Sequence, residues 1–190
     1  LTTAGEDSGR VGHHGLRVGL VERQAEALGL PLSVVRLPAD CSNETYETRM
    51  AETMDTLRAD GVRACVFGDV ALEEVRAYRE DHLEDTEITP SFPLWGTDTG
   101  TVAEALLDAG YQATVVAVDR SVLDRSAVGR PYDRSFNDTL PAEVDPAGEN
   151  GEFHTFVHDG PIFDRPVAAT VGETVERELD GARYAYADLE

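Results

Sequence analysis

The stretch DPAGENGEFHTFVHDGPIF, residues 145–163, places two glycines and two carboxylates directly before a strand-like pattern. Gly148 and Gly151 permit tight turns, and Glu149 and Glu152 stand three residues apart. The residues that follow have a period of two, which is typical of a β-strand and not of a helix. The stretch therefore predicts a loop that delivers two carboxylates to the beginning of a strand.

Two carboxylates at such a position have two interpretations. They repel anions, so they suit a phosphate site only through a cation, either Mg²⁺ or an ammonium ion that they bind and help to deprotonate. In a chain with 37 Asp and Glu residues, a Gly/Asn/Glu cluster is also typical of a solvated turn. Composition alone leaves both interpretations open.

The composition is strongly acidic. The formal net charge is −21, and all 16 basic residues are Arg. Self-repulsion of this size is screened in molar salt, where the Debye length is about 3 Å, so we infer an organism with a salt-rich cytoplasm. The acidity argues against non-specific nucleic-acid binding, and any phosphate contact from a permanently charged side chain must come from Arg.

At 190 residues the chain can bury a hydrophobic core. No apolar run approaches the roughly 20 residues of a membrane span and no signal peptide opens the sequence, so we expect a cytoplasmic protein with no membrane partner. Cys41 and Cys65 have no metal-ligand spacing, and we expect neither a metal site nor a disulfide from them.

The first half of the chain alternates strand-like and helix-like segments. Strands are expected at 1–3, 32–37, 64–67 and 92–95, and helices at 16–28, 43–60, 72–83 and 99–109. This alternation predicts an α/β fold with a Rossmann-like (HUP-type) parallel sheet, covered by helices on both faces. The second half differs: we expect a strand at 114–118, a short helix at 133–138, and a hairpin of 167–178 and 182–189 turning at Asp180-Gly181.

Gly68 and Asp69 follow the apolar strand expected at 64–67. Ligands of open α/β sheets bind beyond the carboxyl ends of the strands, so this pair is a candidate site, although a turn in which the aspartate caps the next helix is an equal alternative. Arg76 and Arg79 lie one turn apart on that helix. Surface ion pairs with neighbouring acids explain Arg79, whereas a phosphate or carboxylate clamp stays open for Arg76.

The chain resembles the diphthine–ammonia ligase family, the N-type ATP pyrophosphatases, which are a branch of the PP-loop ATPases. The similarity runs from about residue 1 to about residue 172. It lies in six ordered segments: HGLR (14–17), QAEALGL (24–30), VFGD (66–69), FPLW (92–95), GR and YD (129–133) and GENGEFHT (148–155).

The resemblance implies an ATP-dependent amide ligase that adenylates a substrate carboxylate and amidates it with ammonium, giving AMP and pyrophosphate. It implies ATP and Mg²⁺ as cofactors, and as substrate a diphthine-bearing elongation factor or a corrinoid acid. Glu149 and Glu152 would be catalytic. The residues expected to bind the substrate are Gly148, Asn150, Gly151, His154 and Thr155, and those expected to bind the nucleotide are His14, Gly68 and Asp69.

The adjacent His13 and His14 also invite a metal interpretation, but no third ligand has a recognisable spacing. Two departures from the family pattern affect the substrate more than the chemistry. Ala147 stands where the most similar proteins often carry a Cys. The sequence ENGEFH (149–154) is similar to a sister subgroup associated with corrinoid salvage, whereas diphthine ligases tend to have EGGEF or EGGEY.

Residues 3–8, TAGEDS, imitate the phosphate-binding PP-loop SGGKDS, but Glu6 replaces the Lys and no complete strand precedes them. We expect the PP-loop on the order of 30 residues upstream, or its loss in a non-catalytic nucleotide-binding module, and no ATP hydrolysis by these 190 residues alone. Residues 1–96 are then a partial PP-loop ATPase domain, and 97–190 a smaller α+β substrate domain that carries the glutamate loop.

Overall fold

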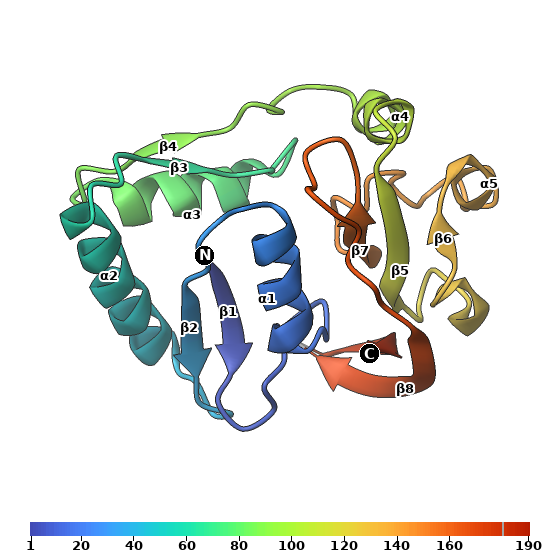
Figure 1. Ribbon diagram of the computed structural model, residues 1–190, viewed down its shortest axis with the longest axis horizontal. Helices are drawn as coiled ribbons and strands as arrows, with labels where there is room; N and C mark the ends of the chain where they lie inside the picture. Colours follow the sequence, from blue (N-terminus) through green and yellow to red (C-terminus); the bar gives the residue numbers. More distant parts are fainter. Residues whose placement is uncertain (180) are drawn as a thin grey trace.

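The computed structural model describes residues 1–179 and 181–190 and shows a mixed α/β chain (Figure 1). In chain order the elements are β1 (Thr2–Gly5), α1 (Val18–Ala27), β2 (Val34–Leu37), α2 (Asn43–Ala59), β3 (Ala64–Val66), α3 (Glu73–Leu83), β4 (Thr89–Ser91), α4 (Thr99–Asp108), β5 (Gln112–Asp119), η1 (Arg125–Ala127), β6 (Pro131–Tyr132), α5 (Arg134–Asn137), β7 (Phe153–Asp159), β8 (Val171–Leu179) and β9 (Ala182–Leu189). The turn predicted at Asp180-Gly181 includes Asp180, which lies outside the described residues.

The first half of the chain contains two separate parallel strand pairs. β1 pairs with β2, and β3 pairs with β4, each in parallel register and each joined by a helix. The predicted α/β character is confirmed, but within the part of the chain that the structure describes no ladder joins the two pairs into one sheet. Periodicity reveals that strands exist and does not reveal which strands pair.

The prediction of a strand at 92–95 is wrong. β4 ends at Ser91, and the next residues form a turn in which the Trp95 N–H donates to the Phe92 carbonyl at 3.2 Å. Pro93 has no N–H to give to a ladder, which favours the turn over a longer strand.

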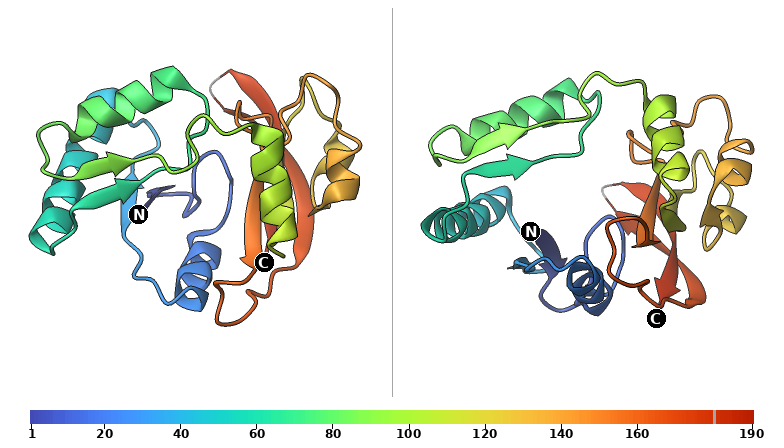
Figure 2. Two further views of the ribbon diagram at one scale, coloured as in Figure 1. Left: turned by 90° about the horizontal axis from the view of Figure 1, so that it is seen from above. Right: turned by 45° about the horizontal axis from the view of Figure 1, so that its top comes forward.

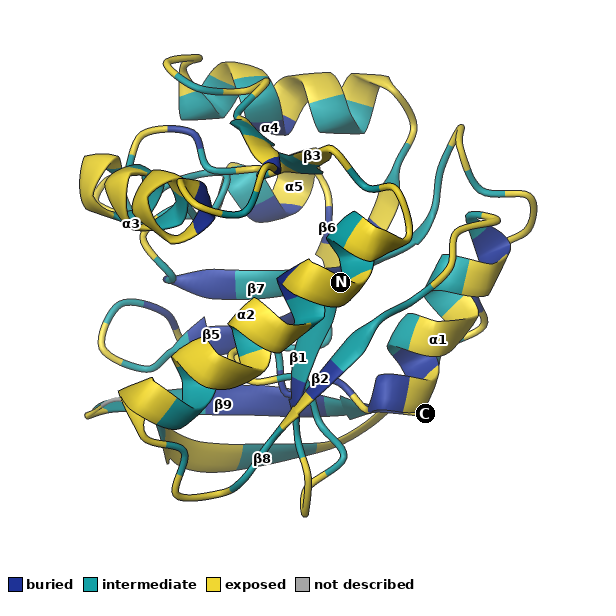
Figure 3. Ribbon diagram, turned by 90° about the vertical axis from the view of Figure 1, so that its left-hand side faces the viewer, coloured by how far each residue is buried: buried dark blue, intermediate teal, exposed yellow. Residues whose placement is uncertain are grey.

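The β3–β4 pair is covered on one side only. The apolar run of β3 predicted burial on both faces, but Val66 is 68% exposed, while Cys65 packs against a core cluster. Figure 3 accordingly shows no buried segment in β3. The inward side packs on a small core of residues from α2, α3 and the segment before β4: Met54, Leu83 and Ile88. Figure 2 shows α3 alongside the two strands.

The predicted helices form, with ends close to those expected from their caps. After α1, Gly29 has φ +66°, and the Leu30 N–H returns to the Ala25 carbonyl at 2.9 Å, which is a glycine C-cap. At the start of α2, the Ser42 hydroxyl accepts from the Thr45 N–H at 3.2 Å, as the capping pattern predicts.

An antiparallel sheet organises the second half of the chain. Its central strand β5 pairs with β6, β7 and β9, and β8 pairs with β9, which confirms the predicted final hairpin. Residues 115–118 of β5 are completely buried. The first residues of β7 therefore lie on a rigid central strand.

Both faces of β7 are packed. Phe153 lies in one core cluster with Phe136, and Phe156 lies in the other with Leu20 of α1 and Leu189 of β9. Figure 1 accordingly shows α1 between the β1–β2 pair and the strands of the C-terminal sheet. The second cluster thus ties the two halves of the chain together.

In the described part of the chain no helix is both long enough and apolar enough to cross a membrane.

Candidate functional site

The loop of residues 145–152, here called the glutamate loop, precedes β7 and contains two glycines in the left-handed region. Gly148 has φ +69° and Gly151 has φ +83°, which confirms the tight turns expected of them. A Cβ on Gly148 would lie 2.8 Å from the Phe153 carbonyl oxygen. This close approach makes glycine necessary at that position.

Glu152 is buried inside the glutamate loop, with 7% of its surface exposed. Its Oε1 accepts from the Asp145 N–H at 2.9 Å and from Asn150 Nδ2 at 3.0 Å, and its Oε2 accepts from the Asn150 N–H at 3.1 Å. These contacts join the two ends of the loop. A buried carboxylate is stable when it receives such donors.

Glu149 points out of its own loop to the first half of the chain. Its Oε1 accepts from the backbone N–H groups of Val70 and Ala71 at 2.8 and 2.9 Å. Those amides lie between β3 and α3, directly after Gly68 and Asp69. One predicted catalytic carboxylate is therefore next to two of the predicted nucleotide-binding residues, although 79 positions separate Glu149 from Val70.

Asp69 does not cap α3, whose N-cap is Leu72. It instead forms a two-point pair with Arg79, with Oδ2 2.6 Å from Nε and Oδ1 3.2 Å from Nη2. The guanidinium also lies 4.6 Å from the centre of the Phe67 ring. The surface pairing expected for Arg79 with its helix neighbours is wrong, because the strand end before the helix supplies a better-aligned carboxylate. Gly68 is exposed, with open space where a Cβ would be.

Arg76 lies over two aromatic rings. Its guanidinium is 5.0 Å from the centre of Phe92 and 4.7 Å from that of Trp95, and its Nε donates to Glu80 at 2.8 Å. The sequence indicated a choice between an ion pair and a clamp, and the structure shows an ion pair supported by cation–π contacts. Both rings belong to the FPLW segment (92–95), which was predicted to be a strand and forms a turn. The predicted strand gave no indication that these rings would meet Arg76.

His14, from the loop between β1 and α1, meets His154 at the start of β7. Their ring centres are 4.6 Å apart, and the His13 ring is 6.1 Å from that of His154. Burial, with His14 and His13 adding smaller contributions, lowers the pKa of His154 to about 4. Burial and the neighbouring His13 also lower the pKa of His14. A predicted nucleotide residue and a predicted substrate residue thus form an uncharged pair at neutral pH.

Two tyrosines that sequence reasoning missed support the glutamate loop. Tyr132 of β6 donates its hydroxyl to the Pro146 carbonyl at 2.6 Å, and Tyr184 of β9 donates to the Gly151 carbonyl at 3.2 Å. Tyr132 stood in a segment that resembled the family, whereas nothing in the sequence connected Tyr184 with a loop 33 positions earlier. Thr155, a predicted substrate residue, lies opposite Val115 in the β5–β7 ladder.

The carboxylates of this region do not form a cation cage. Across residues 1–179 and 181–190 there is no group of three or more His, Cys, Asp and Glu side chains arranged to hold a metal ion. Both Glu149 and Glu152 point oxygens at N–H donors instead. The described residues therefore do not by themselves fit the oxygen-rich Mg²⁺ site that the family resemblance implies.

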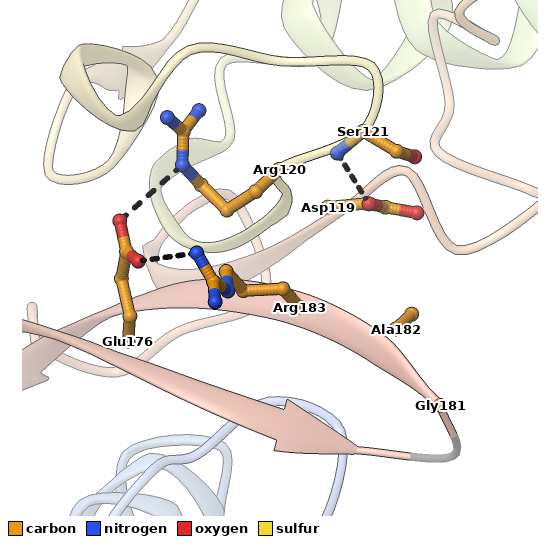
Figure 4. A pocket seen from close by; sticks show the side chains of 7 residues that line it. All are labelled: Asp119, Arg120, Ser121, Glu176, Gly181, Ala182 and Arg183. Carbon is orange, nitrogen blue, oxygen red and sulfur yellow. Dashed lines mark hydrogen bonds and ion pairs between the residues drawn. The ribbon is translucent and has the colours of Figure 1, made fainter.

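A polar cavity of about 560 Å³ lies between the end of β5 and the β8–β9 hairpin (Figure 4). Arg120 and Arg183 approach the two oxygens of Glu176 at 3.5 and 3.9 Å, and Asp119 accepts from the Ser121 N–H at 2.7 Å. Both arginines of the cavity thus face Glu176, and Asp119 is engaged by a backbone N–H. None of the residues predicted for the site lines it.

Known proteins are similar to both halves of the chain, including the segments that meet at this site. Models of the diphthamide synthase N-terminal and C-terminal domains match residues 2–85 and 98–185. The chain is also similar to diphthine–ammonia ligase from Bos taurus, with 23% identity over 192 residues, which cover 93% of this chain and 70% of the relative. The first domain match includes Val70 and Ala71, and the second includes the glutamate loop that contacts them. The chain therefore belongs to the diphthamide synthase family.

Proposed function

We propose that the protein is an ATP-dependent amide ligase that adenylates a substrate carboxylate and amidates it with ammonium. The observation that carries the proposal is the contact of Glu149 with the Val70 and Ala71 amides, beside Gly68 and Asp69. Amides at the carboxyl end of a parallel strand are where α/β proteins bind nucleotides. The similarity to diphthine–ammonia ligase supports the same chemistry.

In the first step, a substrate carboxylate oxygen attacks the α-phosphorus of ATP, and the bond to the β-phosphate breaks with loss of pyrophosphate. In the second, the nitrogen of ammonia bonds to the acyl carbon, AMP leaves, and Glu149 takes a proton from the nitrogen. His14, Gly68 and Asp69 would lie on the nucleotide side. The family resemblance implies a catalytic role for Glu152 as well, but because its oxygens are engaged within the loop we assign the proton transfer to Glu149 alone.

For the substrate side we propose Gly148, Asn150, Gly151, His154 and Thr155, as the family resemblance implies. His154 and His14 in contact give the acyl and nucleotide sides a shared, uncharged wall. Such a wall suits an acyl-adenylate, because exclusion of water protects a reactive intermediate from hydrolysis.

We also propose that a parallel strand from a segment preceding β1 joins the β1–β2 and β3–β4 pairs into one Rossmann-like sheet and carries the PP-loop. Among the described residues each pair is a separate two-stranded sheet, so both pairs have edges open to a further strand. In that arrangement residues 1–96 complete the nucleotide domain and 97–190 form the substrate domain.

The test is AMP release from ATP by the full-length protein in molar KCl with Mg²⁺ and ammonium. It is run without an acceptor, with an elongation factor that bears diphthine, and with a corrinoid acid. AMP release that requires the factor supports a diphthine ligase. Release that requires a corrinoid acid in place of the factor keeps the chemistry and changes the substrate. ATP binding with no AMP release under any of these conditions would overturn the enzyme proposal and favour a non-catalytic nucleotide-binding module.

A further inference from the structure

The two ends of the glutamate loop are tied to the antiparallel sheet by tyrosine hydroxyls. Tyr132 holds the Pro146 carbonyl and Tyr184 holds the Gly151 carbonyl, at 2.6 and 3.2 Å. Tyr132 belongs to β6 and Tyr184 to β9, and both strands pair with β5, whose residues 115–118 are completely buried. The loop is thus anchored to strands that flank the buried centre of this half of the molecule.

Glu152 fastens the same loop from inside. Its three N–H donors come from Asp145 and Asn150, so one carboxylate fixes the beginning and the apex of the turn together. The Asn150 side chain takes part through Nδ2, which a glycine at that position could not do. The sequence difference at residue 150 therefore adds a contact to the loop.

Glu149, unlike Glu152, does not hold its own loop together. Its Oε1 accepts from the N–H groups of Val70 and Ala71, in another part of the chain, and it is only partly buried. The two carboxylates that looked equivalent in the sequence have separate environments.

We propose that Glu152, Tyr132 and Tyr184 are positioning residues that hold the glutamate loop in a single conformation, so that Glu149 is the one loop carboxylate that acts at the reaction centre. This inference rests on the proposed function and deepens it. Displacement of a catalytic group by about 1 Å can cost on the order of a hundredfold in rate, so loosening the loop lowers turnover without removing a reacting group.

The experiment compares Tyr184→Phe with Tyr78→Phe in the full-length protein. Both substitutions delete only a hydroxyl, but Tyr78 lies on α3, is 44% exposed and has its ring 3.9 Å from that of His82 on the same helix. Hydrogen exchange of the Asn150 and Gly151 amides reports on the loop directly, and steady-state kinetics with ATP and ammonium reports on its consequence.

For Tyr184→Phe we expect faster exchange at both amides, roughly a tenfold lower kcat and an unchanged KM for ATP, whereas Tyr78→Phe matches wild type in all three. Unchanged loop exchange would overturn the inference, and so would a lower kcat accompanied by an equal rise in the KM for ATP. If wild type forms no amide with any acceptor, the proposed function fails, and the exchange measurement still decides whether the clamp exists.

Discussion

At the scale of single residues, Glu149 and Glu152 show how far spacing can be trusted. The sequence alone singled out both carboxylates as candidate functional residues of the loop, and the glycines beside them as turn residues. The partners of the carboxylates could not be predicted, because the Val70 and Ala71 amides are brought to Glu149 by the fold and not by any local pattern. The meeting of His14 with His154 has the same origin.

The two carboxylates should respond differently to the same substitution. Glu149→Gln keeps an acceptor oxygen for the Val70 and Ala71 amides but loses the base, so we expect amide formation to fall by about a hundredfold or more with little change in stability. Glu152→Gln turns one acceptor into a donor that faces an N–H, so we expect the free energy of unfolding to fall by about 1–3 kcal/mol.

Urea unfolding and amide formation, measured on both variants of the full-length protein, provide mutual controls. Equal loss of stability in the two variants would contradict the separation of roles. Wild-type turnover in Glu149→Gln would remove Glu149 from the reaction.

His154 makes stability sensitive to mild acid. Its pKa is about 4 in the folded protein and near 6.5 when unfolded, so the unfolded state binds more protons between these values. The contribution of neutral His154 to the free energy of unfolding is fully present above pH 6.5 and is lost as the pH falls to 4. This contribution is at most ~3 kcal/mol. We expect His154→Phe to flatten this part of the curve of unfolding free energy against pH.

The matched control is Tyr78→Phe, since Tyr78 lies on α3, is 44% exposed and has no group that titrates between pH 4 and 6.5. It should leave the slope between pH 6.5 and 4 unchanged. If His154→Phe shows the wild-type slope, the acid sensitivity belongs to other groups.

At the scale of elements, helices were predicted well and strand partners poorly. Helix signals are local: Ser42 caps α2 and Gly29 ends α1 where the sequence places them. The errors lie in short strands, where Pro93 turned an expected strand into a turn and Val66 proved exposed. Burial of a strand depends on which elements lie above and below it, and these are distant in sequence.

The glutamate loop as an element depends on a close backbone approach at Gly148. Gly148→Ala places a Cβ 2.8 Å from the Phe153 carbonyl, whereas Gly29→Ala has a similar φ of +66° and open space around it. Both substitutions place a Cβ on a residue in the left-handed conformation, which costs about 1 kcal/mol. Only Gly148→Ala also brings that Cβ into a clash with the backbone.

We therefore expect thermal unfolding to show a larger loss for Gly148→Ala than for Gly29→Ala, by about 1–3 kcal/mol. Ammonium-dependent turnover should fall only in the first variant, because only that substitution shifts the loop. Equal effects of the two substitutions would mean that the loop relaxes around a Cβ at no cost.

At the scale of the whole molecule, two kinds of contact hold the halves together. One is apolar, where Leu20 of α1 packs with Phe156 and Leu189. The other is ionic: Asp188 of β9 pairs with Arg17 and Arg10 from the segment before α1, at 2.5 and 2.8 Å. The Arg17 hydrogen bond, followed by those from Arg10, keeps the pKa of Asp188 low, at about 2. These favourable pairs act against a general excess of negative charge.

That excess predicts a strong dependence of stability on salt. With a formal net charge of −21, the compact state repels itself, and salt screens the repulsion as the Debye length falls from about 10 Å at 0.1 M to about 3 Å at 1 M. We expect the thermal midpoint to rise between 0.1 and 2 M KCl, even though the same salt weakens the Asp188 pairs, because the exposed acids far outnumber such pairs.

The control is a variant in which six exposed acids that form no ion pair with another described residue become Gln: Glu22, Glu52, Glu74, Glu104, Glu143 and Glu178. With less repulsion to screen, this variant should be more stable than wild type at 0.1 M KCl and should gain less from added salt. An equal gain in both proteins would point to a general effect of salt on apolar burial, and no gain in either would remove the basis for inferring a salt-rich cytoplasm.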